Sequence, residues 1–422
     1  MAFVSLLLWG LNTPTRMLPV RVSERSLLVA RVASGCEAFE EAVIGLFPSV
    51  SSGTAITGTA GVQSGHTRSP DLLSCQRAYR VAMTDGNADV FTFDGGAVEP
   101  GETRRFRFSV SETYLGDPVR IPVTIINGTE PGPTAFLTAA IHGDELNGIE
   151  VVREVAQEWD HEEVCGTIIC LPVLNVQGFT TQERYLPIYE RDLNRAFPGK
   201  RDSTSSNRIA YKIYTNFVEP CDFGLDFHTS TRGRSNMFHV RADMDDEGTA
   251  RLARAFGTNL IMAGEGSEGM LRREATEDGI PTITLEMGEA HRFERDLIDH
   301  AIEGVRSVFA EYGIYPQETV RWPGWRTVIE SWSEKTWLRA DAGGIVEMHF
   351  DRGDLVHKGE TICRITNPFK TDETTVEAPF TGLLVGVLEN PVVYPGNPLC
   401  HFIKIGAQQE AIVEERTGIS HN

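Results

Sequence analysis

A histidine and a glutamate three residues apart, His142 and Glu145, could bind a metal ion. They follow an apolar run, residues 133–141, that indicates a buried strand, and Gly143 lets the backbone turn between them. Residues 146–159 then carry apolar side chains at helical spacing. Open α/β sheets place their active sites at the C-terminal ends of strands, and His with Glu suits zinc. The stretch predicts a strand, a turn bearing two metal ligands, and a helix.

The same His-x-x-Glu spacing occurs three more times, and we expect none of these pairs to bind metal. Two lie in the charged, amphipathic pattern of residues 291–312, which predicts a solvated helix face. The third spans Gly359 in a β-type region, which favours a solvated turn. The three pairs are His291/Glu294, His300/Glu303 and His357/Glu360.

Further polar residues stand at the ends of two later predicted strands, in Asp226-Phe-His228 and in Leu285-Glu286-Met-Gly. Two His and one Glu make the three-protein-ligand set of a catalytic zinc, which leaves a position open for water. Zinc in such a site activates that water at neutral pH. A separate carboxylate must then carry a proton to the leaving amine, and Glu286 suits this role.

Two loop segments could supply the cations that amide chemistry needs. Arg184 is a candidate to offset charge on the carbonyl oxygen. Asn194 and Arg195 could grip a substrate carboxylate through bidentate hydrogen bonds. Each residue also has a simpler interpretation. His228 could be a hydrogen-bonded histidine at a strand end, Glu286 could pair with a buried Arg, and Asn194-Arg195 could form a loop cap and a surface ion pair.

Together these motifs resemble the succinylglutamate desuccinylase/aspartoacylase family, within the zinc carboxypeptidase-like group, over roughly residues 105–405. The resemblance rests on His142-Gly-Asp-Glu145, Arg184-Tyr-Leu, Asp192-Leu-Asn-Arg195, Asp226-Phe-His228 and Leu285-Glu286-Met-Gly. It implies a carboxypeptidase-like α/β fold followed by a small β domain, and one Zn²⁺ per chain. It implies these roles: His142, Glu145 and His228 as zinc ligands, Glu286 as general base and acid, Arg184 polarising the carbonyl, and Asn194 with Arg195 on a substrate carboxylate.

Two departures from the family pattern bear on the substrate and leave the expected reaction unchanged. The third residue of the first motif is Asp144, where mammalian aspartoacylases have Asn. The motif resembles that of microbial members, which include deacetylases acting on N-acetyl-diaminobutyrate in ectoine breakdown. The loop from Arg184 to Asp192 is also longer than in the type members.

The elements that must position these residues alternate between strand and helix, which predicts a mixed sheet covered by helices on both faces. Two alternating β-type runs, 105–110 and 119–126, come first. The later strands are expected at 135–141, 166–174, 223–228, 237–241, 259–262 and 282–287, and helices at 145–159, 205–218, 247–257 and 293–312.

Changes in composition and residue patterning along the chain predict four segments. Residues 1–82 include a low-complexity Ser/Gly/Thr stretch and are expected to be a disordered or non-native extension, with a targeting segment as the alternative. Residues 83–320 form the catalytic α/β domain, 321–410 a small all-β barrel-sandwich domain, and 411–422 a tail. Two similar halves, beginning at Gly344 and Gly382, suggest an internal repeat in the β domain.

Composition excludes some classes of function. The 422 residues carry a net charge of −20, which argues against nucleic acid or an anionic membrane as partner. Six of the 39 basic residues are Lys, compatible with a salt-loving host or with Arg-rich codon usage. Seven scattered Cys give no disulfide framework and favour the cytoplasm. No apolar run is long enough for a transmembrane helix.

The sequence predicts a zinc-dependent hydrolase of N-acyl amino acids, and two rivals stay open. One is a metallocarboxypeptidase, and the other is a zinc-free binding module. Arg272-Arg273 could reach a substrate side-chain carboxylate, although a solvated helix face is the favoured interpretation. Lys370 lies where carrier domains bear a modified lysine, but its context, Pro368-Phe-Lys-Thr-Asp372, argues against attachment.

Overall fold

The computed structural model describes residues 88–187, 190–315, 329–331 and 334–417. The extension predicted for residues 1–82 lies outside this range. Within the described part, no helix is long and apolar enough to cross a membrane.

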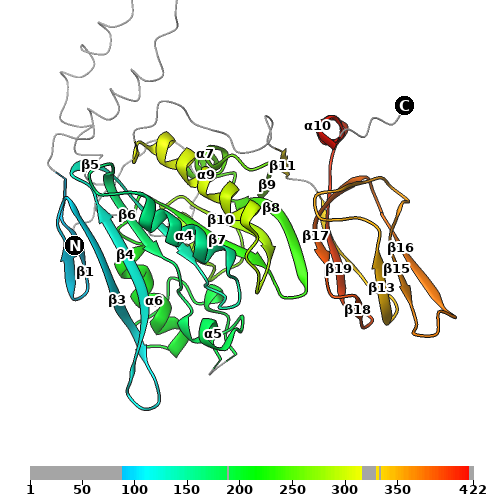
Figure 1. Ribbon diagram of the computed structural model, residues 1–422, viewed down its shortest axis with the longest axis horizontal. Helices are drawn as coiled ribbons and strands as arrows, with labels where there is room; N and C mark the ends of the chain where they lie inside the picture. The colour runs from blue at the N-terminus through cyan, green and yellow to red at the C-terminus, as the bar shows by residue number, and fades with distance from the viewer. Residues whose placement is uncertain (1–87, 188–189, 316–328, 332–333, 418–422) are drawn as a thin grey trace, which may run out of the picture. The chain divides into compact units, whose positions relative to one another are not determined.

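A 13-stranded mixed sheet organises the chain (Figure 1). The path across it is β12 (Lys335–Arg339), β19 (Pro398–Lys404), β17 (Gly382–Leu388), β8 (Arg234–Ala242), β10 (Thr282–Glu289), β7 (Phe223–Ser230), β5 (Glu130–Ala139), β6 (Cys165–Leu171), β4 (Pro118–Asn127) and β3 (Glu102–Glu112). Off this path, β9 (Leu260–Ala263) pairs with β8, β11 (Ile329–Ser331) with β9, and β14 (Leu355–Val356) with β17. A separate hairpin joins β1 (Phe91–Phe93) and β2 (Gly96–Val98).

The centre of the sheet is parallel and buried on both sides. Strands β10, β7, β5 and β6 pair in parallel, and β7 is buried along its whole length. Continuous apolar runs such as residues 168–171 of β6 suit this position, because no face of a central parallel strand meets water. Strands β3 and β4 pair in antiparallel at the outer edge, and buried and more exposed positions alternate along much of each strand.

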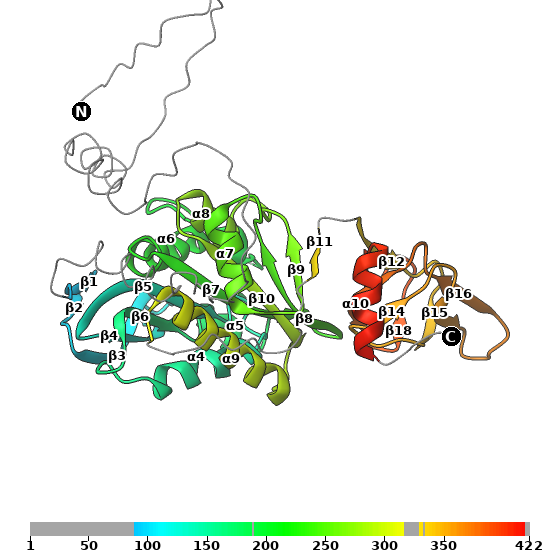
Figure 2. The same ribbon diagram turned by 90° about the horizontal axis from the view of Figure 1, so that it is seen from above.

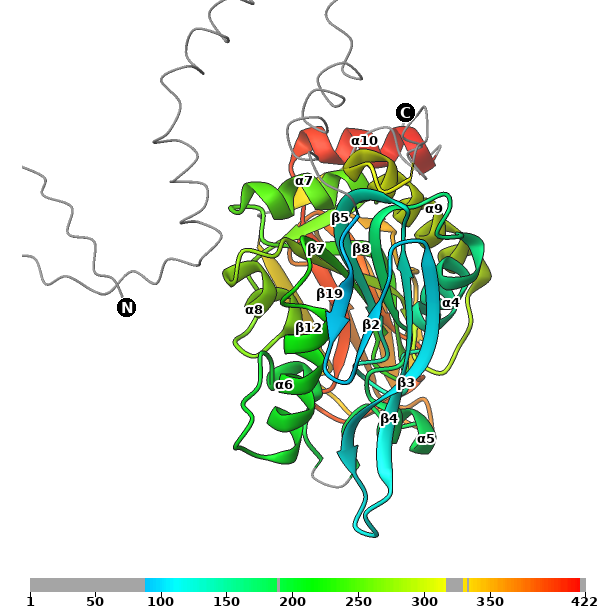
Figure 3. The same cartoon turned by 90° about the vertical axis from the view of Figure 1, so that its left-hand side faces the viewer.

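Helices cover both faces of the sheet (Figure 3). On one face α4 (Asn147–Glu158), α7 (Glu247–Phe256) and α9 (Arg295–Tyr312) pack on a single apolar core. On the other, α6 (Ser205–Phe217) and α8 (Leu271–Glu277) pack on a second. The α/β class, the mixed sheet and the four expected helices are therefore confirmed, with helix ends within about two residues of prediction. The short α-helix α5 (Val176–Thr181) and the 3₁₀ turn η1 (Leu193–Arg195) complete this part.

The C-terminal strands continue the central sheet. β17 pairs with β8, for example Gly386 with Asn236, so the all-β region shares a sheet with the α/β region. A second, four-stranded sheet holds β16 (Glu373–Glu377), β15 (Thr361–Thr366), β13 (Gly344–Met348) and β18 (Val392–Val393). The two sequence halves match in strand order: β13, β14 and β15 in the first, β17, β18 and β19 in the second.

Two observations refine the C-terminal expectations. Residues 407–417 form helix α10, and Val413 is buried in a core with Leu383 and Ile403, so the stretch expected to be a tail begins as a packed helix (Figure 2). Lys370 lies in the turn between β15 and β16 and is exposed.

Candidate metal centre and active site

Three strand ends lie side by side where the predicted site residues meet. Thr138 of β5, which lies four residues before His142, is paired with Asp226 of β7. His228 of β7 is paired with Glu286 of β10. Neighbouring strands lie about 4.8 Å apart, so this register alone brings the second histidine beside the candidate base.

His142, Glu145 and His228 form a compact buried cluster. One ligand atom from each lies within 4.8 Å of the others. Glu145 bridges the two rings: Oε1 lies 2.8 Å from Nδ1 of His142, and Oε2 lies 2.9 Å from Nδ1 of His228. The two Nδ1 atoms are 3.2 Å apart. The structure therefore brings the three predicted ligands together, each with a lone-pair atom facing a common point.

A carboxylate lies behind each histidine. Nε2 of His142 is 3.1 Å from Oδ1 of Asp192, and Nε2 of His228 is 2.8 Å from Oδ2 of Asp226. Thr138 Oγ1 donates to the other oxygen of Asp226 at 2.8 Å. Carboxylates in this position fix the ring tautomer of a metal-ligating histidine. Both aspartates stand within the motifs quoted above, although their residue types and spacing alone predict no role for them.

The electrostatics of the cluster favour a positive charge between the rings. Burial raises the pKa of Glu145, but the two histidines outweigh it and hold that pKa well below its usual value. Burial lowers the pKa of His228, but Asp226 and Glu145 outweigh it and raise it well above its usual value. A divalent cation supplies such a charge, and two imidazoles with one carboxylate are a zinc donor set. The residues present thus fit zinc.

Gly143 sets the close approach of the ligand turn to α5. A Cβ added to it would lie 2.1 Å from the backbone carbon of Gly178 and 2.2 Å from the nitrogen of Phe179. Its own N–H donates to the carbonyl of Arg184 at 3.3 Å. Asn175, the N-cap of α5, donates to that same carbonyl. The turn between the two ligands and the start of the Arg184 loop are therefore held together.

Arg184 lies at the metal cluster. Its Nη1 donates to Oε1 of Glu145 at 2.6 Å, and about a quarter of its side chain is exposed, at 25 %. The guanidinium therefore borders the point on which the ligands converge while staying accessible. This placement is compatible with the expected contact to a substrate carbonyl, which stays a prediction.

Glu286 has two polar partners. Its Oε1 is 3.1 Å from Nε of Arg241, and its Oε2 accepts from Nδ2 of Asn236 at 3.0 Å. The pairing with an arginine is the simpler interpretation weighed from sequence, and it is present. Glu286 is nevertheless paired with His228 in the sheet, and its side chain is 15 % exposed. Both observations are compatible with the catalytic role, which stays a prediction.

Asn194 and Arg195 lie in the 3₁₀ turn that Asp192 caps. The side-chain oxygen of Asn194 accepts from Leu271 N at 2.9 Å, so any contact of this side chain with a ligand falls to its Nδ2. Nη1 of Arg195 donates to the carbonyl of Asn194, and its side chain is 44 % exposed. Both the loop-cap interpretation and the predicted carboxylate contact are compatible with this geometry.

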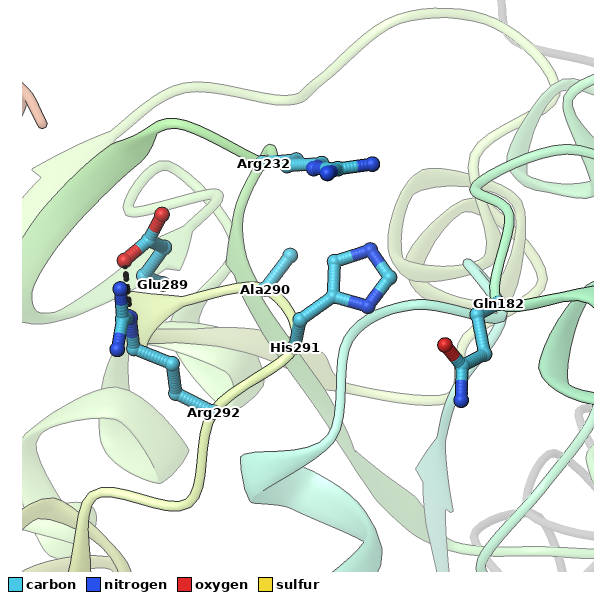
Figure 4. Close-up of a pocket in the computed structure, with 6 residues that line it drawn as sticks. All are labelled: Gln182, Arg232, Glu289, Ala290, His291 and Arg292. Atoms are coloured by element: carbon cyan, nitrogen blue, oxygen red, sulfur yellow. Dashed lines mark hydrogen bonds and ion pairs between the residues drawn. The ribbon is translucent and has the colours of Figure 1, made fainter. Parts of the chain in front are cut away.

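One of two neighbouring hollows borders the ligand turn. One, of about 380 Å³, is lined by Gln182, Arg232 and the segment Glu289–Arg292, and Figure 4 shows Arg232 above His291 with Gln182 across the opening. The other, of about 500 Å³, shares Gln182 and His291 and includes Gly143 and Asp144. Open space therefore adjoins the turn that carries the metal ligands.

Two expectations about charged residues are wrong. Arg272 is not on a solvated helix face: it is buried, and its Nη1 donates to Gly264 O at 2.7 Å, because the side of α8 that carries it faces the rest of the fold. Glu294 is not on a helix face either. It precedes α9 as the N-cap residue and binds Glu289 N and Arg352 through its carboxylate.

The other predicted His/Glu spacings have the expected surroundings. His300 lies exposed on α9. His357 and Glu360 close a turn, with Glu360 Oε2 accepting from His357 N at 2.7 Å. Within the described residues, the cluster at His142 is the one group of three or more His, Cys, Asp or Glu arranged to hold a metal ion.

Comparison with known proteins finds a matching family model and a curated relative. Residues 131–312 match the model of the succinylglutamate desuccinylase/aspartoacylase catalytic domain. Over 266 residues, 61 % of this chain and 78 % of the relative, the sequence is 26 % identical to an N-alpha-acetyl-L-2,4-diaminobutyric acid deacetylase from Halomonas elongata.

Solved structures share the fold. The ectoine utilization protein EutE (DoeB) from Ruegeria pomeroyi superposes with a TM-score of 0.65 at 23 % identity, covering 76 % of this chain and 99 % of that one. A succinylglutamate desuccinylase from a Silicibacter species gives 0.62 at 24 % identity, covering 76 % and 100 %. Residues 131–312 therefore resemble the catalytic domain of the succinylglutamate desuccinylase/aspartoacylase family, and the ligand geometry is compatible with that resemblance.

Proposed function

We propose that this protein is a zinc-dependent hydrolase that cleaves the amide bond of an N-acylated amino acid, releasing a small carboxylic acid and a free amine. The observation that carries the proposal is the cluster of His142, Glu145 and His228, with an aspartate behind each histidine. The relatives are deacylases or deacetylases by name, which supports amide hydrolysis.

His142, Glu145 and His228 would hold the zinc, and Asp192 and Asp226 would orient the two rings. When bound, zinc supplies Lewis acidity and activates a water molecule at neutral pH. The remaining roles fall to side chains of the protein. These side chains would act on the carbonyl oxygen, on the transferred proton and on the substrate carboxylate.

Glu286 is the proposed proton carrier. In this account, a carboxylate oxygen of Glu286 takes a proton from the attacking water and delivers it to the nitrogen of the leaving amine. Arg241 and Asn236 hold the carboxylate in place beside His228. A single residue can act first as base and then as acid because the amide nitrogen needs the proton that the water has lost.

Arg184 and Arg195 would bind two different groups of the substrate. Arg184, at the metal cluster, would donate to the substrate carbonyl oxygen as negative charge develops there. Arg195, with Nδ2 of Asn194, would hold the α-carboxylate and so fix the distance from that group to the scissile amide. The α-carboxylate contact selects a free amino acid derivative rather than an internal peptide bond.

The same proposal includes the setting of the reaction. It places the catalytic α/β domain at residues 83–320 and a barrel-sandwich β domain at 321–410. It expects a small-molecule substrate in the cytoplasm, with neither nucleic acid nor membrane as partner.

Amine release from a panel of amides tests the proposal. The panel holds N-succinylglutamate, N-acetylaspartate, Nα-acetyl-2,4-diaminobutyrate and a short peptide with a free C-terminus, each assayed with and without a zinc chelator. Chelator-sensitive release from an acyl amino acid is expected. Release from the peptide alone would reassign the protein to the carboxypeptidases. Absence of both bound zinc and turnover would favour the binding module.

A further inference from the structure

Strand β10 changes register directly after the candidate base. Its pairing with β7 and β8 shifts between Glu286 and the residues that follow, Gly288 and Glu289. Gly288 takes a positive φ of 71°, and a Cβ added to it would lie 1.8 Å from Oε1 of Glu294. A β-bulge bends its strand and changes the direction of the side chains beside it. The contacts that hold this bulge therefore bear on where Glu286 points.

Two side chains from outside β10 hold the bulge. Oε1 of Glu294, the N-cap residue of α9, accepts from Glu289 N at 2.8 Å. Asn147 is buried at the start of α4, two residues after the predicted ligand Glu145. Its Nδ2 donates to Met287 O at 3.0 Å, and its Oδ1 accepts from Glu294 N at 2.9 Å. The bulge is thus tied both to the helix that follows the ligand turn and to the start of α9.

Arg352 reaches the same contacts from the all-β region. Its Nη2 donates to Oε2 of Glu294, and its Nη1 donates to Oγ of Ser235. Ser235 is buried on β8 and precedes Asn236, whose Nδ2 donates to Oε2 of Glu286. One guanidinium therefore links the bulge that follows Glu286 to the strand segment that holds the Glu286 carboxylate.

The turn that carries Arg352 lies between β13 and β14 and is fixed to β17. Gly353 N donates to Leu384 O at 2.7 Å, and Leu384 N donates to Asp354 O at 3.0 Å. β17 in turn pairs with the start of β8, where Val387 lies opposite Ser235. Backbone hydrogen bonds thus hold the turn in place, and the guanidinium extends from a fixed support.

The ion pair between Arg352 and Glu294 is largely shielded from water, with 29 % and 21 % of the two side chains exposed. Burial raises the pKa of Glu294, but the hydrogen bonds from Arg352 and from Glu289 N outweigh it and lower that pKa. A carboxylate this shielded is costly without its cation. Loss of Arg352 should therefore turn Glu294 towards water and leave Glu289 N without its acceptor.

We propose that Arg352 and Glu294 are positioning residues for the proposed general base, because together they fix the β10 bulge and the start of β8 that direct Glu286 at the metal centre. The inference rests on the proposed function of the site and gives the all-β region a part in it. Within the described residues, no hydrogen bond or ion pair joins either residue to a metal ligand, to Arg184 or to Arg195. Their loss should therefore affect proton transfer and spare zinc and substrate binding.

Arg352→Met tests the positioning role in the zinc-loaded full chain. A misdirected base slows the chemical step, so kcat for the best acyl amino acid should fall about 10- to 100-fold. KM and the zinc content should stay as in the wild type, because the substrate and metal contacts survive. Arg352→Lys keeps the charge beside Glu294 and should recover a large part of kcat.

Glu294→Gln is a second variant that breaks the pair with little change in volume. Its amide oxygen can still accept from Glu289 N, but its NH₂ group then faces the donors of Arg352, so kcat should again fall with KM unchanged.

Arg364→Met is the matched control. Arg364 also lies in the all-β region and pairs with a glutamate, Glu373, at 3.9 Å, but about half of each side chain is exposed. Its loss should leave kcat unaltered. Equal kcat for the wild type and Arg352→Met would overturn the positioning role, as would a loss that appears in KM alone or that Arg364→Met reproduces.

Hydrogen–deuterium exchange separates this inference from the proposed function, because it needs no turnover. Amides of residues 287–294 should exchange roughly tenfold faster in the Arg352→Met full chain than in the wild type, and those of α7 should exchange alike in both. This result would support the contact that fixes the bulge even if no amide in the panel were hydrolysed, an outcome that would count against the hydrolase alone. Unchanged exchange at residues 287–294 would overturn the positioning role even if amides were hydrolysed.

Discussion

Asp192 and Asp226 determine which nitrogen each histidine offers to the metal point. Each aspartate contacts Nε2 of its histidine, so Nδ1 of both His142 and His228 faces Glu145. Had the rings been free, their orientation would have had to be fixed at the moment of metal binding. The aspartates therefore contribute preorganisation, and their loss should weaken the site without removing a ligand.

Asp226→Asn tests this contribution. The variant keeps all three ligands but weakens the acceptor behind His228, so zinc affinity should fall by about 10- to 100-fold. Competition with a chromophoric chelator measures the change. Asp160→Asn, at an exposed carboxylate, is the control and should leave affinity unaltered. An Asp226→Asn protein that holds zinc as tightly as the wild type would show that the carboxylate has no such role.

Glu286→Gln tests the proton carrier. The substitution keeps size and the three ligands, so zinc content by atomic absorption should stay at one per chain. Turnover should fall about 100-fold or more, the usual contribution of a positioned acid and base. Unimpaired turnover would leave Glu286 as a structural partner of Arg241 and Asn236 only.

The residues of the site differ in how far sequence could reveal them. His142, Glu145 and His228 are predictable because each stands at the end of an apolar strand run. Arg272 is not, because two adjacent arginines on a short helical pattern favour solvent. Only the packing of α8 against the sheet shows that one of them is buried. Asp192 and Asp226 could have been suggested by the rule that ligating histidines have carboxylate partners.

At the scale of elements, the turn between β5 and α4 depends on its contact with α5. Gly143→Ala should push the turn away from Gly178 and Phe179, since the new Cβ would lie within 2.2 Å of the backbone there. We expect a loss of about 1–3 kcal/mol in the free energy of unfolding, as for overpacking, and substoichiometric zinc. Denaturant unfolding and metal analysis measure both.

Gly406→Ala is the matched control for that substitution. Gly406 is exposed, and the nearest atom to an added Cβ is Gln409 Oε1 at 4.0 Å, so neither stability nor zinc content should change much. If Gly143→Ala unfolded and bound zinc like this control, the α5 contact would not be what positions the ligand turn.

Strand ends show where local sequence stops being informative. The run predicted at 166–174 ends as β6 at Leu171, because Pro172 has no N–H to donate to the ladder. The run at 135–141 ends as β5 at Ala139, where Ala140 takes a positive φ of 47°. The run at 237–241 is longer as β8, starting at Arg234, because β17 pairs with it there. A distant partner strand leaves no mark on the local pattern.

At the scale of the molecule, the pairing of β8 with β17 joins the α/β region and the all-β region in one sheet. Met237, Leu260 and Met262 share a core with Leu383 and Ile403. The sequence indicated the change to an all-β region after residue 320 and its internal repeat. It did not indicate this pairing, because strands some 150 residues apart carry no local signal of their register.

Removal of residues 334–417 should therefore destabilise what remains. The start of β8, at Arg234 to Asn236, would lose its partner strand, and Met237, Leu260 and Met262 would lose their apolar cover, a combination that favours aggregation. Gel filtration and thermal unfolding of the truncated chain beside the full chain measure this. A soluble, cooperatively unfolding truncated monomer would mean that the β8–β17 contact contributes little.

Titration of the metal-free full chain with zinc is the decisive measurement for the proposed zinc hydrolase, with amine release from the best acyl amino acid as the readout. We expect a rate that rises in proportion to added zinc and stops rising at one equivalent, and a His228→Ala protein that shows no such rise. Amide hydrolysis that proceeds at full rate without zinc, or that is unaffected by loss of His228, would contradict it.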